Sequence, residues 1–220
     1  MSSSPSATSW RRQWTGRRPS CATACQHKSE QQAALASRTV LVCQRLDAEK
    51  DTALGVRAFA ASNLTAMGWQ LKIAGDGVER APLERLIAEL SLGPSVHLLG
   101  FTPDVRPLML GATVLLAPAP AEPLGMTVLE AMALGLPVVA TSGGGHLETV
   151  GTVAGALMFP PGDASAGAAA LRHLAAHPTT AREYGARCRD VQRSSFDLAA
   201  HVRAVTAHYA VDDRVRPSSI

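Results

Sequence analysis

Short apolar segments alternate with helical patterns along most of the chain, and this alternation constrains the fold more than any other feature. The expected strands are TVLVC (39–43), WQLKIAG (69–75), SVHLLG (95–100), TVLLAP (113–118), PVVAT (137–141) and ALMF (156–159). The expected helices are 51–63, 79–92, 104–110, 125–134, 146–150, 166–177, 181–191 and 198–209. This pattern predicts an α/β fold, a doubly wound, Rossmann-like parallel sheet with helices on both faces.

The stretch Ala121–Val139, AEPLGMTVLEAMALGLPVV, combines a helix start with two carboxylates. A helix that begins near Gly125 directs unpaired backbone N–H groups forward, an arrangement that suits a phosphate. Glu122 and Glu130 have seven residues between them, and both are expected to face one cleft. Carboxylates repel phosphate but accept hydrogen bonds from a vicinal diol such as a ribose or a hexose. The stretch therefore predicts a nucleotide-sugar site.

This stretch, with the run LEAMALGLPVVA, resembles the E-x7-E segment of retaining glycosyltransferases of family 4, except that Leu124 replaces the family's common Phe. Members of that family have the two-domain GT-B architecture. The resemblance extends over residues 39–209 and implies the C-terminal half, the domain that binds the sugar donor. It implies that Glu130 binds the ribose and that Glu122, with the backbone of Leu124–Met126 and the adjoining Thr127, binds the sugar.

Two cations follow the first expected strand. Arg45 offers a planar fork and Lys50 a mobile point charge, and together they suit a diphosphate leaving group. The segment CQRLDAEKD resembles the family's g-R-L-x-x-x-K-G, with Gln44 and Asp51 at positions where the family usually has glycine. Arg45, Lys50 and Glu122 are thus the predicted catalytic residues. Ordinary exposed cations are the alternative for Arg45 and Lys50.

Further candidates follow other strands, where ligands of such sheets bind. Gly75 and Gly77 form a tight turn, either close to the ligand or purely structural. By the resemblance, backbone groups near Phe101 and Thr102 receive the base. Gly144 and Glu148 fit the family's g-G-x-x-E, although Glu148 is equally explained as a carboxylate in the first turn of a helix. These residues complete the predicted sugar-nucleotide site.

The charge of +3 is unevenly distributed. Residues 1–38 carry six basic residues and one acidic residue, whereas the remainder carries 15 basic and 17 acidic residues. The predicted domain therefore offers no electrostatic support for nucleic-acid binding. No apolar run reaches the length of a membrane span. The four cysteines, Cys21, Cys25, Cys43 and Cys188, are expected to be reduced thiols of a cytoplasmic protein.

Metal ligands are few. Cys21, Cys25 and His27 are weak candidates for a metal site, and so are His173 and His177, which are spaced four apart on an expected helix. No D-x-D motif is present. No metal or other cofactor is therefore expected, and cations with a helix terminus would neutralise the diphosphate instead.

The predicted domain comprises residues 38–210. Residues 1–37 are rich in Ser and Arg, lack apolar periodicity and are predicted to be a disordered tail. An organellar transit peptide and a truncated or misplaced start are the alternatives. Residues 211–220 are expected to be a flexible C-terminal tail.

Three functions remain at this stage. The first is a retaining glycosyltransferase whose acceptor, a glycan, lipid or small molecule, binds with an N-terminal domain supplied elsewhere, which also provides any membrane association. The second is a sugar-nucleotide-binding fragment without turnover. The third, a dinucleotide oxidoreductase, is disfavoured because no G-x-G-x-x-G follows the first strand. The family's last helices pack on the N-terminal domain, so an exposed apolar patch, or a missing partner chain that covers it, is predicted at Phe196–Tyr209.

Overall fold

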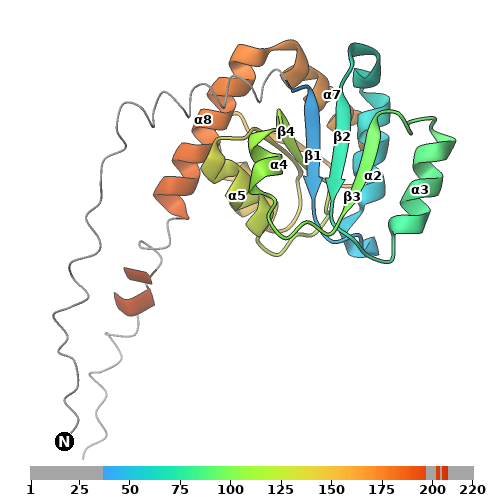
Figure 1. Ribbon diagram of the computed structural model, residues 1–220. Coiled ribbons are helices and arrows are strands. Elements are labelled where there is room, and N and C mark those ends of the chain that lie inside the picture. The colour runs from blue at the N-terminus through green and yellow to red at the C-terminus, as the bar shows by residue number, and fades with distance from the viewer. Residues whose placement is uncertain (1–36, 197–201, 204, 208–220) are drawn as a thin grey trace, which may run out of the picture.

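The computed structural model describes residues 37–196, 202–203 and 205–207, and its centre is a parallel sheet (Figure 1). Within these residues the sheet has six strands in the order β3-β2-β1-β4-β5-β6, and every neighbouring pair is parallel. The strands are β1 (Thr39–Cys43), β2 (Gln70–Ala74), β3 (Val96–Gly100), β4 (Val114–Ala117), β5 (Val138–Thr141) and β6 (Leu157–Phe159). The predicted doubly wound fold is confirmed.

The central strands of the sheet are fully buried. Every residue of β1, β4 and β5 is buried, whereas the edge strand β3 is only partly covered. These central strands are rich in valine, leucine and alanine, the composition expected for strands covered on both faces. Burial on both faces fixes where each strand ends, and therefore where the loops that follow it begin.

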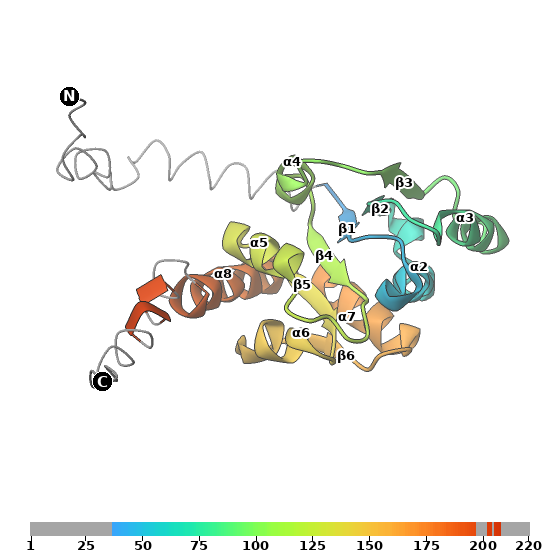
Figure 2. The ribbon, with the colours of Figure 1, turned by 90° about the horizontal axis from the view of Figure 1, so that it is seen from below.

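Helices cover both faces of the sheet (Figure 2). On one face α2 contacts both α3 and α7, and on the other α5 contacts both α4 and α8. The helical segments are η2 (Ala48–Lys50), α2 (Thr52–Ala61), η3 (Leu64–Met67), α3 (Arg80–Glu89), α4 (Arg106–Leu110), α5 (Met126–Leu134), α6 (Gly145–Glu148), η4 (Val150–Thr152), α7 (Ala164–Ala176) and α8 (Pro178–Ser195). Here η denotes a 3₁₀ helix.

Several helix ends differ from the sequence prediction. The helix α7 ends at Ala176, close to the expected 177, and Pro178 then opens α8, where its missing N–H costs no hydrogen bond, so that α8 is longer than the expected 181–191. The helix α3 ends before Ser91, which has a positive φ of 55°, rather than at Gly93-Pro94. The 3₁₀ segments η2, η3 and η4 carry no apolar periodicity, which explains why that pattern did not predict them.

Some predictions concern residues that the structure does not describe. The tails at 1–36 and 211–220 lie outside the described residues, as do Cys21, Cys25 and most of the predicted patch at Phe196–Tyr209. Within that patch Val202 and Val205 are described, and both are exposed. Among the described helices, none has the length and apolarity required to cross a membrane.

Candidate sugar-nucleotide site

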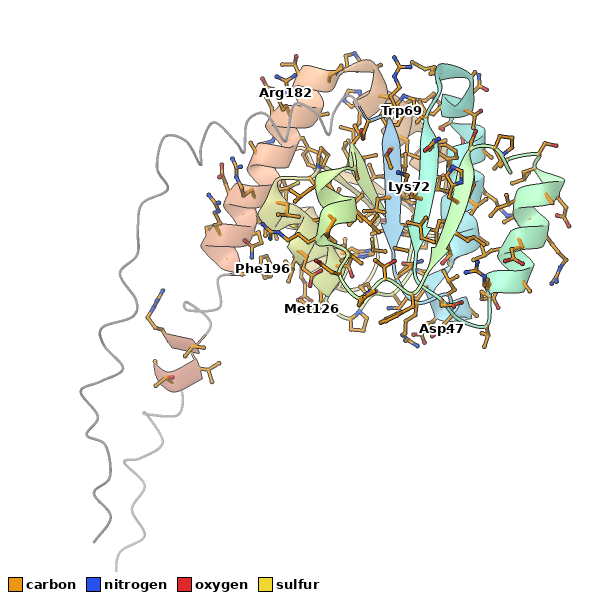
Figure 3. All side chains as sticks on the ribbon, in the orientation of Figure 1. Asp47, Trp69, Lys72, Met126, Arg182 and Phe196 are labelled. Atoms are coloured by element: carbon orange, nitrogen blue, oxygen red, sulfur yellow. The ribbon has the colours of Figure 1, made fainter. Side chains whose placement is uncertain are left out.

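The candidate site lies at the end of the sheet to which the strands point. Asp47 and Met126 mark this end in Figure 3, and Trp69 and Arg182 mark the opposite one. The strand order reverses between β1 and β4, and ligands of open α/β sheets bind outside the strand ends at such a reversal. The loops after β1, β4 and β5 all reach this point.

A contact between the first two of these loops forms the centre of the site. The Nζ atom of Lys50 lies 2.8 Å from Oε2 of Glu122. The two side chains are only 15% and 19% exposed. Both residues line a pocket of about 340 Å³, together with Gly125 and Thr127. The structure thus brings together Lys50, which was predicted to bind the diphosphate, and Glu122, which was predicted to bind the sugar.

The two departures from the family pattern in the first loop are both accommodated. The side-chain amide of Gln44 donates to the backbone oxygen of Lys50 at 2.9 Å and to Oγ1 of Thr52 at 2.8 Å, which ties the loop to the start of α2. Asp51 has a φ of 42°, a left-handed conformation in which aspartate is tolerated better than most residues. Its carboxylate caps α2 by accepting from the N–H of Leu54 at 3.1 Å.

Arg45 is held at the rim of the pocket by acids of its own loop. Its guanidinium donates to Oε1 of Glu49 at 2.8 Å and also bonds Asp47. The Arg45 side chain is 67% exposed, unlike that of Lys50. Arg45 lines both the Lys50–Glu122 pocket and the neighbouring one, so a ligand that spans the two would pass its guanidinium.

Glycines allow the loops after β4 and β5 to touch. Glu122 and Gly144 form a parallel bridge, and the N–H of Gly145 donates to the backbone oxygen of Glu122. A Cβ atom on Gly143, Gly144 or Gly145 would overlap the carbonyl oxygen of Pro120, Glu122 or Pro123 respectively. The backbone of Glu122 is therefore positioned by a short continuation of the sheet.

The helix α5 begins at this pocket. Gly125, at its N-cap, has a φ of 84°, a conformation that glycine adopts without steric cost. The first N–H groups of a helix have no partner within the helix, and the helix dipole makes this end partly positive. The pocket therefore combines a helix N-terminus, an ammonium group and a carboxylate.

His146 also lines this pocket and was not predicted as a site residue. It is 1% exposed, and its Nδ1 lies 3.1 Å from the hydroxyl of Thr141, which is itself bonded to the backbone oxygen of Ala119. Burial lowers the pKa of His146, an effect that Glu122 partly opposes. The sequence signal was present, since a histidine directly follows Gly143–Gly145, but no pattern assigned it a role.

A second pocket of about 380 Å³ adjoins the first and shares Cys43, Gln44, Arg45 and Thr127 with it. It is lined by the predicted residues Gly75, Phe101 and Thr102, and the Phe101 side chain is 78% exposed. Gly77 lies outside the lining and packs against the backbone of Leu46, which favours the structural interpretation of this glycine. An exposed aromatic ring beside this pocket suits stacking on a base.

The two predicted carboxylates line different pockets, although they were expected to face one cleft. Glu130 lines a third pocket, with Asp104, Arg106 and Met109. Thr127 lines the other two pockets, and Glu130 lies one turn further along α5 on a similar face. The length of that turn separates Glu130 from the pocket of Glu122. Burial, and secondarily the charge of Glu130, raises the pKa of Cys43 to about 12. The charge of Glu130 therefore reaches Cys43, which lines both of the other pockets.

The last predicted residues are peripheral. Glu148, the last residue of α6, is exposed and is absent from the lining of these three pockets. Leu124 and Met126 are exposed at the mouth of the Lys50–Glu122 pocket. The rings of His173 and His177 lie 4.8 Å apart, but among the described residues no group of three potential metal ligands is found.

Comparison with known proteins identifies the family. The model of the glycosyl transferases group 1 matches residues 26–191, which is most of the chain. The chain belongs to this family.

Two curated relatives match parts of the chain. The 2-deoxystreptamine glucosyltransferase of Streptomyces kanamyceticus is 35% identical over 120 residues, 54% of this chain and 31% of the relative. The exopolysaccharide phosphotransferase SCO2592 of Streptomyces coelicolor is 30% identical over 158 residues, 71% of this chain and 17% of the relative. This group 1 chain thus spans less than a third of either relative.

Solved structures confirm the fold. HepE from Anabaena, in complex with UDP, superimposes with a TM-score of 0.74 at 23% identity, covering 84% of this chain and 52% of that protein. HepE has also been solved in complex with UDP-glucose. At this level of identity the likeness establishes a GT-B-type fold for the group 1 chain. The chain spans about half the length of HepE.

Proposed function

We propose that this chain is the sugar-donor-binding domain of a retaining, family 4-like glycosyltransferase that takes a nucleoside diphosphate sugar. The observation that carries the proposal is the 2.8 Å contact between Lys50 and Glu122 beside the N-terminus of α5. This arrangement offers positive groups for a diphosphate and an acceptor for hydroxyl groups, side by side. UDP and UDP-glucose in the complexes of HepE support the ligand class.

The pockets suggest how the ligand would lie. The diphosphate would contact Lys50 and the first N–H groups of α5, and Arg45 would approach it from the rim. The hexose would contact Glu122 with the backbone around Leu124–Met126, while the base would extend toward Phe101 and Thr102. Glu130 would bind the ribose from the third pocket, so the nucleoside would lie across Thr127, which lines the other two pockets.

The same groups suit the chemistry of transfer. The bond between the anomeric carbon and the diphosphate oxygen breaks, a bond from the acceptor hydroxyl forms with retention of configuration, and the hydroxyl proton leaves with the phosphate or with water. Negative charge then grows on the leaving diphosphate, next to Lys50 and the positive end of α5. Stabilisation of that charge in the transition state is what accelerates the reaction. In this proposal it requires no metal.

The acceptor and the N-terminal domain belong to the proposal as well. The relatives are two to six times longer than the matched region, which supports a second domain that completes the cleft, binds an acceptor and provides any membrane association. A cytoplasmic location remains a prediction from the reduced cysteines. The alternative function, sugar-nucleotide binding without turnover, predicts the same ligand affinities but no transfer.

Calorimetric titration of the purified chain with UDP, GDP and ADP tests the proposal. We expect one nucleotide to bind, and we expect Lys50→Ala to weaken its binding by at least tenfold. A matched control is Lys72→Ala, on β2 away from these pockets, which should bind like the wild type. If none of the three nucleotides binds, or if both lysine variants behave alike, the proposed site is wrong.

A second assay separates the enzyme from the binding fragment. The chain is incubated with UDP-glucose, or with the hexose conjugate of whichever nucleotide binds, and release of the free nucleoside diphosphate is followed. Slow release that Lys50→Ala abolishes would support catalytic competence. Tight binding without any release would favour the non-catalytic alternative.

A further inference from the structure

His146 is a buried polar residue at the candidate sugar-nucleotide pocket, and neither the sequence patterns nor the comparisons give it a role. It is 1% exposed, yet it is one of the residues that line the pocket with Lys50 and Glu122, and the charges of both residues act on its imidazole. Burying an imidazole is unfavourable unless its nitrogen atoms find partners. One nitrogen has a partner in the described part of the chain, which is Nδ1 beside the hydroxyl of Thr141.

The hydrogen bonds around Thr141 determine which nitrogen of His146 carries the proton. The Thr141 hydroxyl has one hydrogen, and its bond to the backbone oxygen of Ala119 must use it, because a carbonyl oxygen only accepts. Toward His146 the hydroxyl can then only accept. Nδ1 is therefore the nitrogen that bears hydrogen, and in the neutral ring Nε2 is left with a free lone pair.

The environment of His146 disfavours the charged form of the imidazole. Burial lowers the pKa of His146 and Lys50 reinforces the decrease, while Glu122 and a hydrogen bond with the backbone of Thr141 act in the opposite direction. Among the described residues, Nε2 has no hydrogen-bond partner. The residues that line the pocket thus include two with acceptor atoms, Glu122 with its carboxylate and His146 with Nε2, beside the ammonium group of Lys50.

We propose that Nε2 of His146 accepts a hydrogen bond from a hydroxyl group of the transferred sugar, with Thr141 holding the ring in the required tautomer. An acceptor cannot bind a fully ionised phosphate, which has no hydrogen to donate, and in the proposed function the ribose hydroxyls contact Glu130 in the third pocket. This atom therefore recognises the glycosyl end of the ligand. His146 is thereby a specificity residue beside Glu122, and Thr141 is its positioning residue. The inference rests on the proposed function, because it needs a sugar nucleotide in this pocket.

Titration of the chain with UDP and UDP-glucose, or with the GDP or ADP pair if that base binds, tests the role of His146. His146→Phe keeps the ring and removes the lone pair. We expect this variant to bind the nucleoside diphosphate with unchanged affinity. Its affinity for the sugar conjugate should be about three- to tenfold lower, which corresponds to the loss of one neutral hydrogen bond. His173→Phe, on the exposed face of α7, is the matched control and should change neither affinity.

Deoxy analogues of the sugar nucleotide identify the hydroxyl that His146 contacts. The 2-, 3-, 4- and 6-deoxyglucose conjugates are titrated against the wild type and against His146→Phe. One analogue should bind the wild type more weakly than the complete sugar nucleotide does. The same analogue should bind His146→Phe with no further loss of affinity, because the two changes remove the same hydrogen bond. Independent losses for all four analogues would overturn the inference.

The tautomer is measured separately by ¹⁵N nuclear magnetic resonance of the wild-type chain, which does not depend on whether a variant folds. The shifts should identify Nδ1–H, and Thr141→Val should allow the Nε2–H form to appear. A wild-type signal from Nε2–H, or equal weakening of UDP and UDP-glucose by His146→Phe, would refute the inference and leave the proposed function intact. Failure of the wild type to bind any of these nucleotides would instead refute the proposed function itself.

Discussion

The ammonium group of Lys50 lies 2.8 Å from the carboxylate of Glu122, 72 positions further along the chain. The two residues belong to loops that follow β1 and β4, neighbouring strands whose order in the sheet brings the loops together. In the proposed function each group has a different ligand partner, the diphosphate and the sugar. Ligand entry would therefore exchange one internal ion pair for two contacts with the ligand.

Breaking this pair is expected to lower stability, because each side chain is more than four-fifths buried. Lys50→Met should decrease the free energy of unfolding by roughly 1–3 kcal/mol, since it leaves the Glu122 carboxylate without its partner. Urea denaturation measures the change. The control is Arg45→Met, in an exposed ion pair, for which we expect less than about 0.5 kcal/mol. Equal effects of the two variants would contradict the prediction.

The proposed ribose contact of Glu130 predicts discrimination against 2′-deoxynucleotides. The wild type should bind the preferred nucleoside diphosphate more tightly than its 2′-deoxy form, by roughly 1.5–3 kcal/mol for a hydrogen bond to a charged group. Glu130→Ala should bind both forms with the same, weaker affinity, as calorimetry would measure. Glu148→Ala is the matched control and should retain the discrimination. A wild type that does not distinguish the two nucleotides would exclude this role of Glu130.

The glycines at the β4–β5 loop contact provide a steric test. Gly145→Ala would place a Cβ atom against the backbone of Pro123 and displace the loop that carries Glu122. We expect a loss of about 1–3 kcal/mol in stability from overpacking, together with greatly weakened sugar-nucleotide binding. Gly93→Ala is the control, because its added Cβ atom would meet nothing within 4 Å. Neither glycine has a positive φ, so the comparison isolates the contact.

Cys43 is expected to be an unreactive thiol in the folded chain. Burial raises its pKa from 9.0 to about 12, so the thiolate that reacts with disulfide reagents is scarce at pH 8. Because the unfolded thiol ionises near pH 9.0, its contribution to stability is complete below that pH and is lost as the pH rises toward 12. Labelling kinetics in a Cys21→Ser, Cys25→Ser, Cys188→Ser background would test this. Rapid labelling before unfolding would contradict it.

The lowered pKa of His146 predicts that the chain loses stability in acid. Its pKa is lowered by burial from the usual histidine value of 6.5, so the unfolded chain takes up a proton at this position before the folded chain does. The contribution is complete above pH 6.5 and decreases as the pH falls through the folded pKa. Thermal unfolding between about pH 7.5 and pH 5 should therefore show a weaker pH dependence for His146→Phe than for the wild type. Parallel curves would indicate that other groups dominate.

Much of the fold was predictable from local patterns. The strands at 39–43 and 138–141 and the helix at 126–134 agree closely with the structure, because continuous apolar runs and a glycine-bounded helix have few alternatives in a buried parallel sheet. The pairing of Lys50 with Glu122 was less directly predictable from the sequence. Their loops were predicted to share one edge of the sheet, but the ion pair depends on a strand order that local patterns do not encode.

The remaining features required three-dimensional information. The separation of Glu130 from Glu122 depends on how one turn of α5 is oriented against α4, and sequence spacing alone left both in one cleft. Gln44 and Asp51 depart from a glycine pattern, yet both stabilise the loop by side-chain hydrogen bonds. His146 was missed because its role depends on the hydroxyl of Thr141, which lies on the preceding strand.

The central position of β1 has a consequence for biosynthesis. This first strand pairs with β2 and with β4, and the helix α2 that follows it is covered by α7, close to the end of the described chain. The contact between α2 and α7 cannot form until α7 has emerged from the ribosome. The helix that follows β1 is therefore covered only late in the synthesis of this domain. Nascent chains that stall before α7 would leave the first half of the sheet without its cover, as substrates for chaperones and proteases.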